Sequence, residues 1–292
     1  MNCHIVPVTY ISHWSTDDTL ACKRPLRKVY VLDKKSPAPV LELKKIVKIK
    51  SPTIVKEDLY ITPEIDEAIE NNMNILYEDK WNSYIDEIES FISNNQGDQI
   101  ITDYLLGFFS LQIYRIEVYI KPAINQILDD FSFITLLAAM SNPESDEKYI
   151  NEKFLKNLLG FLTEKDDNPI SETYKKIKHE NQIVFIITDK TSKHNFITSD
   201  LPAYKIDNDC LAQGYYMPIT PNICLFLRQR KNNNNESRIK SVNDNVIKFI
   251  NHLTYSRAEN IVISKHENIT EQCNDVYPEQ EFIDITNNEV DR

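Results

Sequence analysis

The hydrophobic pattern of this chain changes its period twice, from strand-like to helix-like and back. Residues 1–62 hold the β-prone runs Lys28–Leu32 and Val40–Ile49, and residues 63–180 then place apolar side chains three or four positions apart. The β-prone pattern returns after residue 181, most strongly at Gln182–Thr188. Strands at the two ends of a chain share a sheet when those ends fold back together. We therefore predict an α+β fold with a composite sheet of N- and C-terminal strands and a helical middle region.

Capping signals and spacing place the individual elements. Thr62 followed by Pro63 is typical of a helix start, because Thr is a favourable N-cap residue and Pro fits the first helical position. Asn195–Thr198 is predicted to begin a partner strand for Gln182–Thr188. The other predicted elements are helices at Trp81–Ile92, Asp98–Tyr119 and Ser241–Tyr255 and strands at Asp58–Ile61, Cys224–Leu227 and Asn260–Ser264.

The length of 292 residues is sufficient for one large domain. We expect residues 1–265 to form a single α+β domain, with a helical subdomain at about 63–180. Residues 266–292 carry eight acidic residues against one Arg and show no hydrophobic period, so we expect an acidic, flexible tail there.

Charge is distributed unevenly along the chain. The net charge of −11 disfavours non-specific binding of nucleic acid by the surface as a whole. Residues 23–57 are the exception, with eleven Lys and Arg against three acidic residues. This basic segment either contacts the phosphates of a nucleic acid or belongs to amphipathic strands that expose their lysines to water. Both interpretations are open at this point, and the sequence carries no signal for an oligomeric state.

The sequence favours a cytoplasmic protein that does not associate with membranes. Its longest uncharged apolar stretches, Tyr104–Tyr114 and Phe131–Pro143, are too short to cross a bilayer, and the N-terminus lacks the layout of a signal peptide. Five scattered cysteines without a C-x-x-C pair predict reduced thiols.

Only four glycines occur, and no two of them lie close together. Phosphate-cradling loops need several neighbouring glycines, so a P-loop or a dinucleotide-binding fingerprint is excluded and no cofactor is predicted. No metal site is predicted from the His and Cys spacing. One alternative is the D…E-x-K arrangement of Mg²⁺-dependent nucleases, formed by Asp33, Glu42 and Lys44, although E-x-K arises readily by chance in a chain rich in Lys and Glu.

Several short motifs lie far apart in a fixed order. They are H-I-V-P at His4–Pro7, Q-I-Y-R at Gln112–Arg115, T-S-D-L-P at Thr198–Pro202, P-I-T-P at Pro218–Pro221, and Asn251 seven residues before Ala258. Together they resemble the motifs of a bacterial family known as domain of unknown function 4238, over nearly the whole chain. The resemblance implies a shared arrangement of these residues and does not itself name a reaction.

Four residues of these motifs carry side chains suited to catalysis. His4 titrates near neutral pH and is the natural general acid or base, which Asp200 would orient. Arg115 would hold a phosphate or carboxylate, and Asn251 would donate to a developing oxyanion. This set predicts a metal-independent hydrolase or nuclease-like effector that acts on phosphodiester bonds.

The alternative is a non-catalytic binding or interaction module whose motifs are structural. T-S-D-x-P is also a good way to end a strand, because Asp and Ser bond the backbone and Pro fixes the exit of the chain. The two interpretations differ in one geometric expectation. A catalytic set requires His4, Arg115, Asp200 and Asn251 to converge on one cleft.

Overall fold

The computed structural model describes residues 2–4, 6–23, 26–34, 40–42, 55–57, 78–94, 99–114, 169–206, 214–229 and 239–273. Its helices are α1 (Val8–Ile11), the 3-10 turn η1 (Ser12–Trp14), α4 (Trp81–Asn94), α5 (Gln99–Tyr114), α8 (Pro169–Glu180) and α9 (Asp244–Arg257). Its strands are β1 (Asn2–His4), β2 (Lys28–Asp33), β3 (Val40–Glu42), β4 (Val55–Glu57), β5 (Asn181–Thr188), β6 (Thr198–Ser199), β7 (Tyr204–Ile206), β8 (Gly214–Thr220), β9 (Ile223–Gln229), β10 (Ile239–Val242) and β11 (Ile261–Ser264).

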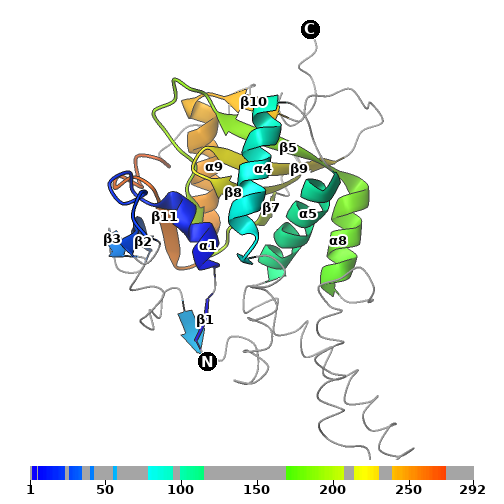
Figure 1. Cartoon of the computed structure of the whole chain (residues 1–292), viewed down its shortest axis with the longest axis horizontal. Helices are drawn as coiled ribbons and strands as arrows, with labels where there is room; N and C mark the ends of the chain where they lie inside the picture. Colours follow the sequence, from blue (N-terminus) through cyan, green and yellow to red (C-terminus); the bar gives the residue numbers. More distant parts are fainter. Residues whose placement is uncertain are drawn as a thin grey trace, which may run out of the picture.

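A five-stranded sheet with the order β10-β5-β9-β8-β7 forms the centre of the described structure (Figure 1). All neighbouring strands in it are antiparallel except β10 and β5, which run parallel. β5 is buried on both faces, which explains its continuous apolar sequence. Ile183 and Phe185 face a core shared with α4, α5 and α8, whereas Val184 and Ile186 face α9.

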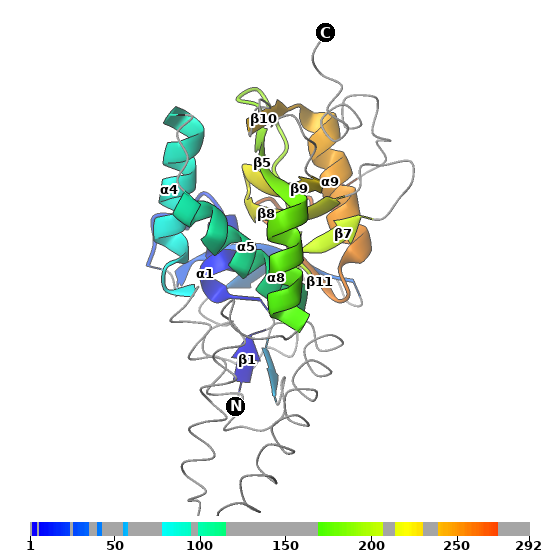
Figure 2. The same ribbon diagram turned by 90° about the vertical axis from the view of Figure 1, so that its right-hand side faces the viewer.

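Helices therefore cover both faces of this sheet. α4 and α5 lie on one side and α9 on the other (Figure 2). α4 has its apolar side chains at helical spacing, and Trp81, Ile85 and Ile88 are at most 2% exposed. α9 begins at Asn243, whose side chain accepts hydrogen bonds from two backbone N–H groups of the first turn. None of the helices in the described ranges has the length and apolar character needed to span a membrane.

A second, four-stranded sheet has the order β3-β2-β11-β6. β11 lies between an N-terminal strand and a strand of the C-terminal half: Val262 pairs with Leu32 on one side and with Ser199 on the other. The predicted composite sheet is thereby confirmed, as is the α+β class. The composite arrangement is confined to this smaller sheet, because the five strands of the central sheet all come from residues 181–242.

The pairing of one predicted strand is wrong. β6 pairs with β11, whereas β5 pairs with β9 and β10, so Asn195–Thr198 does not lead into a partner of β5. The backbone bonds of the two residues directly before β6 explain this pairing. Phe196 N donates to Pro221 O (2.8 Å) and Ile197 N donates to Asn251 Oδ1 (3.0 Å), which directs the chain into the other sheet.

Five of the described strands have no counterpart in the predictions, namely β1, β4, β7, β8 and β10. β8 contains Pro218, which normally argues against a strand, and a register irregularity between Pro218 and Thr220 accommodates it. β10 is only four residues long. The predicted helix start at Thr62, the predicted strand at Asp58–Ile61 and the residues between 115 and 168 lie outside the described residues.

Two charged regions of the sequence have structural contacts. Lys34, in the basic segment 23–57, donates through Nζ to Ala258 O (2.6 Å) and Tyr255 O (3.2 Å), at the C-terminal end of α9 where a cation is favourable. Residues 266–273, assigned by sequence to the acidic tail, form turns in which Ile269 and Cys273 are buried. These two regions therefore contribute to the folded structure.

Candidate functional site

The structure describes the side chains of two of the four predicted site residues. Asp200 and Asn251 are both buried, with exposed fractions of 3% and 0%. His4 is the last residue of β1, where its backbone lies opposite Val55 of β4. The His4 side chain and the whole of Arg115 lie outside the described residues. The expected convergence of the four on one cleft therefore stays a prediction.

Asp200 directly follows β6 and holds the connection between α9 and β11. Its Oδ1 accepts a hydrogen bond from Glu259 N (3.1 Å), and its Oδ2 accepts from Asn260 N (2.8 Å) and Asn260 Nδ2 (3.0 Å). Its own N–H donates to Ile261 O (3.2 Å). A buried carboxyl group that accepts three N–H bonds is committed to the segment that it holds.

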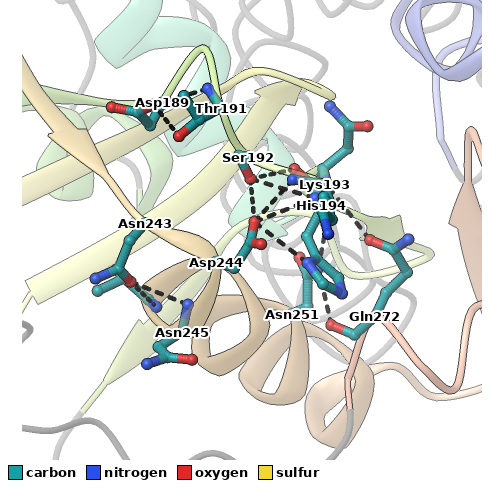
Figure 3. Close-up of polar contacts among 12 residues, drawn as sticks. Asp189, Thr191, Ser192, Lys193, His194, Asn243, Asp244, Asn245, Asn251 and Gln272 are labelled. Atoms are coloured by element: carbon teal, nitrogen blue, oxygen red, sulfur yellow. Dashed lines mark hydrogen bonds and ion pairs between the residues drawn. The ribbon is translucent and has the colours of Figure 1, made fainter.

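Asn251 performs the corresponding task at the other end of this segment. Its Oδ1 accepts from Ile197 N (3.0 Å), and its Nδ2 donates to Asn195 O (2.8 Å) and to Gln272 O (3.1 Å) (Figure 3). Both ends of the amide are thus bonded to backbone groups of two separate segments. Asn251 fixes the start of the segment 195–200 to α9. Asp200 fixes the end of that segment to the turn that follows α9.

The N-terminal motif region contacts the same segment from the opposite side. Trp14 Nε1 donates to Phe196 O (2.9 Å). The Tyr10 hydroxyl contacts Thr198 Oγ1 (2.7 Å) and donates to Pro218 O, so one side chain joins the T-S-D-L-P and P-I-T-P motifs. Burial raises the pKa of Tyr10 well above its ordinary value, which keeps the hydroxyl protonated and able to donate.

Asp244 fastens the preceding loop to the first turn of α9. Its Oδ1 accepts from Ser192 Oγ and from Lys193 N (3.0 Å), and it lies 3.2 Å from His194 Nδ1 (Figure 3). Burial raises the pKa of Asp244, but the hydrogen bonds from Ser192 and His194 outweigh burial and place that pKa below its usual value. His266 adds a contact from Nε2 to Asn195 Oδ1 (2.6 Å). These contacts extend the same scaffold toward the molecular surface.

A different part of the molecule has buried polar groups without such partners. On α5, Leu105, Phe108 and Phe109 form a fully buried stripe, and Gln112 continues it at 1% exposure, since residues three and four apart share a helix face. Neither Oε1 nor Nε2 of Gln112 has a hydrogen-bond partner in the structure described here.

Two more polar atoms in the same helical layer are buried and equally unsatisfied. They are Trp81 Nε1 on α4 and Thr9 Oγ1 on α1, two helices that contact each other, as α4 and α5 do. The Trp81 ring stacks on Phe108 of α5 with centroids 4.2 Å apart, and the Tyr10 ring next to Thr9 lies 5.6 Å from Trp81. We refer to Thr9, Trp81 and Gln112 as the Gln112 site.

The energetics of the Gln112 site require an explanation. More than about 90% of buried polar groups in folded proteins are hydrogen-bonded, and each unsatisfied one costs about 1–3 kcal/mol. Apolar side chains of similar size would avoid that cost. The four unpaired polar atoms of Thr9, Trp81 and Gln112 are therefore exceptions that a bound water, ion or ligand would explain.

The sequence drew attention to Arg115 in the Q-I-Y-R motif and not to Gln112, because a charged side chain suggests chemistry more readily than a neutral one. Arg115 lies outside the described residues, so its role stays a prediction. The available signal was position: Gln112 is the polar residue in a stripe whose other members are Leu and Phe. No three His, Cys, Asp or Glu residues within the described ranges are arranged to hold a metal ion. Asp33, Glu42 and Lys44 cannot be compared with a nuclease site, because residue 44 lies outside those ranges.

Comparison with protein-family profiles identifies a family for this chain. The profile of a family described as "Protein of unknown function (DUF4238)" matches residues 2–268, which is most of the chain. No curated protein and no solved structure matches the chain.

Proposed function

The chain belongs to the DUF4238 family, and we propose that it is a binding module whose Gln112 site recognises a small, uncharged ligand. One observation carries this proposal. Gln112 is 1% exposed, and both ends of its amide are without a partner in the described structure. A ligand with a donor beside an acceptor would satisfy both ends at once.

The motif residues divide into two groups by their contacts. Asp200, Asn251 and the Pro218 carbonyl take part in hydrogen bonds that hold the sheets and α9 together. Gln112 belongs to the motif set but makes no such bond. A ligand that pairs with the amide would account for the burial of Gln112.

The contacts of Asp200 favour binding over the hydrolase that the sequence first suggested. A general base or an orienting carboxylate needs an oxygen directed at its partner, and both oxygens of Asp200 accept backbone N–H groups. A role for Asp200 in holding the chain is sufficient to explain its burial. Catalysis by His4 with Arg115 remains the competing hypothesis.

A thermal-shift panel with the full chain tests the proposal. The probes are nicotinamide, benzamide, the four common ribonucleosides and glucose, each at millimolar concentration. At least one planar probe should raise the melting temperature of the wild type, because binding to the folded state alone stabilises it by RT ln(1 + [L]/Kd).

Two variants make the test specific for the site. Gln112→Met removes the amide at nearly constant volume, and Gln229→Met makes the same change at an exposed position of β9. The shift should vanish in Gln112→Met and persist in Gln229→Met. Equal shifts in both variants, or no shift in the wild type, would refute the proposal. Chromatography of the incubated probes should show no turnover; a new product would favour the hydrolase instead.

A further inference from the structure

We infer that residues 265–273 form a pH-sensitive latch, which is closed near neutral pH and opens in acid when His266 gains a proton. The latch directly follows β11 and contacts the segment 195–200 and α9. It shares no residue with the Gln112 site, and its opening does not depend on a ligand there.

Polar and apolar contacts hold the latch against the rest of the molecule. Asn195 N donates to Gln272 Oε1 (3.2 Å), and Asn251 Nδ2 donates to Gln272 O (3.1 Å) (Figure 3). Ile269 and Cys273 are buried in an apolar cluster with side chains of β11 and of the segment that leads into β6. A short turn fixed by such contacts can open locally while the two sheets stay folded.

The imidazole ring of His266 donates a hydrogen bond in both of its protonation states. Asn195 Nδ2 donates to Pro221 O (3.3 Å), so the Oδ1 of the same amide is the acceptor in its 2.6 Å contact with His266 Nε2. Protonation at Nδ1 therefore keeps this hydrogen bond and changes only the charge of the ring. Because the ring is half-buried, that charge is unfavourable unless an opposite charge compensates it.

The described charges nearest to His266 in the chain do not provide this compensation. Lys265 is positively charged, and its Nζ lies 2.7 Å from Asp17 Oδ1, so the carboxylate from the loop before β2 already pairs with the lysine. Glu267 and Glu271 of the latch are exposed to water, which screens them. The proton on His266 would therefore add a second positive charge beside Lys265.

The loop before β6 also faces His266. His194 of this loop acts electrostatically on His266, and its own Nδ1 lies 3.2 Å from Asp244 Oδ1 at the start of α9. Burial is the largest cause that lowers the pKa of His266, followed by Lys265; Asp17 opposes them and His194 adds to them. The closed latch therefore favours the neutral ring.

The direction of the pH effect follows from this lowered pKa. Opening exposes His266 to water, where its pKa returns to about 6.5. The closed form is most stable above that pH and loses stability as the pH falls below it. Asp17 and Asp244 stay ionised at pH 5.0, because the pKa of each lies below its ordinary value of 3.8. In acid the open latch exposes apolar side chains that it covers at neutral pH.

Hydrogen exchange of the full chain, followed by mass spectrometry at pH 7.5 and pH 5.0, tests the latch. After correction for the intrinsic exchange rate at each pH, the protection of peptides that cover residues 265–273 should fall by about three- to thirtyfold at pH 5.0. The upper limit applies if the ring of the closed form stays neutral, because a free imidazole is protonated about thirty to one at that pH. Peptides of β5 and β9 are the internal reference and should keep their protection.

Two matched variants identify the group responsible. His266→Gln keeps a donor for Asn195 and stays neutral, so its latch should be equally protected at both pH values. His252→Gln makes the same change at an exposed position of α9 and should behave as the wild type. Unchanged protection in the wild type, or an equal fall in His266→Gln, would overturn the inference. An equal fall in β5 and β9 would also overturn it, because the whole molecule would then be unfolding.

Discussion

Replacing Gln112 by Met should make the free protein more stable. Each of the two unsatisfied amide atoms costs about 1–3 kcal/mol in the folded state, and Met fills a similar volume with no polar atoms. Shape differences between similar side chains cost less than about 1.5 kcal/mol. Relaxation of the folded state reduces the gain further, so we expect the free energy of unfolding to rise by about 2 kcal/mol. For a chain of 292 residues that corresponds to about 3 °C in melting temperature.

Equilibrium urea unfolding, followed by tryptophan fluorescence, measures this difference directly. Gln229→Met is the matched control, because the same chemical change at an exposed position should alter the free energy of unfolding by less than about 0.5 kcal/mol. If Gln112→Met is instead destabilised by more than about 1 kcal/mol, Gln112 forms hydrogen bonds in the free protein. That result would refute the argument that the residue is retained for a ligand.

Three other predictions test the scaffold. Asp200→Asn should lower the free energy of unfolding by about 2–4 kcal/mol in urea titrations. The reason is that the side-chain nitrogen of an amide cannot accept a hydrogen bond, so one of the N–H groups of Glu259 and Asn260 loses its acceptor. Asp18→Asn, at an exposed position, is the control. Asn251→Ala should cost a similar amount, about 2–4 kcal/mol, since it leaves three buried backbone groups unpaired, whereas exposed His252→Ala should change little. The third concerns pH. The pKa of His266 is lowered in the folded protein, first by burial and then by Lys265, so folding favours the neutral imidazole ring. The free energy of unfolding should therefore fall as the pH drops below about 6.5. The lowered pKa of Asp244 adds a further loss of stability below about pH 4. His266→Gln should remove the first loss and Asp244→Asn the second, in unfolding curves recorded from pH 3.5 to 7.5, and an unchanged pH profile would contradict the assignment.

The fold was largely predictable where one local pattern dominates. The helix expected at Trp81–Ile92 is α4 (Trp81–Asn94), and the strand expected at Gln182–Thr188 is β5 (Asn181–Thr188). Spacing alone determines these elements, since α4 buries one stripe and β5 buries both faces. The sequence does not predict β8 because Pro218 contradicts the local rule for strands; pairing with β9 and the hydrogen bond from Tyr10 to the Pro218 carbonyl stabilise it there.

The partner of a strand is a long-range property, and this explains the wrong pairing of Asn195–Thr198. The side chain that redirects this segment belongs to Asn251, more than fifty residues later in the chain. No pattern within residues 182–198 contains that information. The composite sheet was predictable for a different reason: strands at both chain ends left only a few ways to complete a sheet.

The same distinction between local and long-range information decides the site. Residue chemistry draws attention to His, Asp and Arg, because charged groups can act as acids, bases and anion ligands. Whether a side chain is available depends on its partners, and for Asp200 the partners are Glu259 and Asn260, far along the chain. Gln112 presents the opposite case, a neutral side chain whose importance appears only when burial and the absence of a described partner are known together. In this chain the two predicted catalytic residues whose side chains are described, Asp200 and Asn251, hold backbone segments in place, whereas Gln112 is a motif residue whose amide has no hydrogen-bond partner in the described structure.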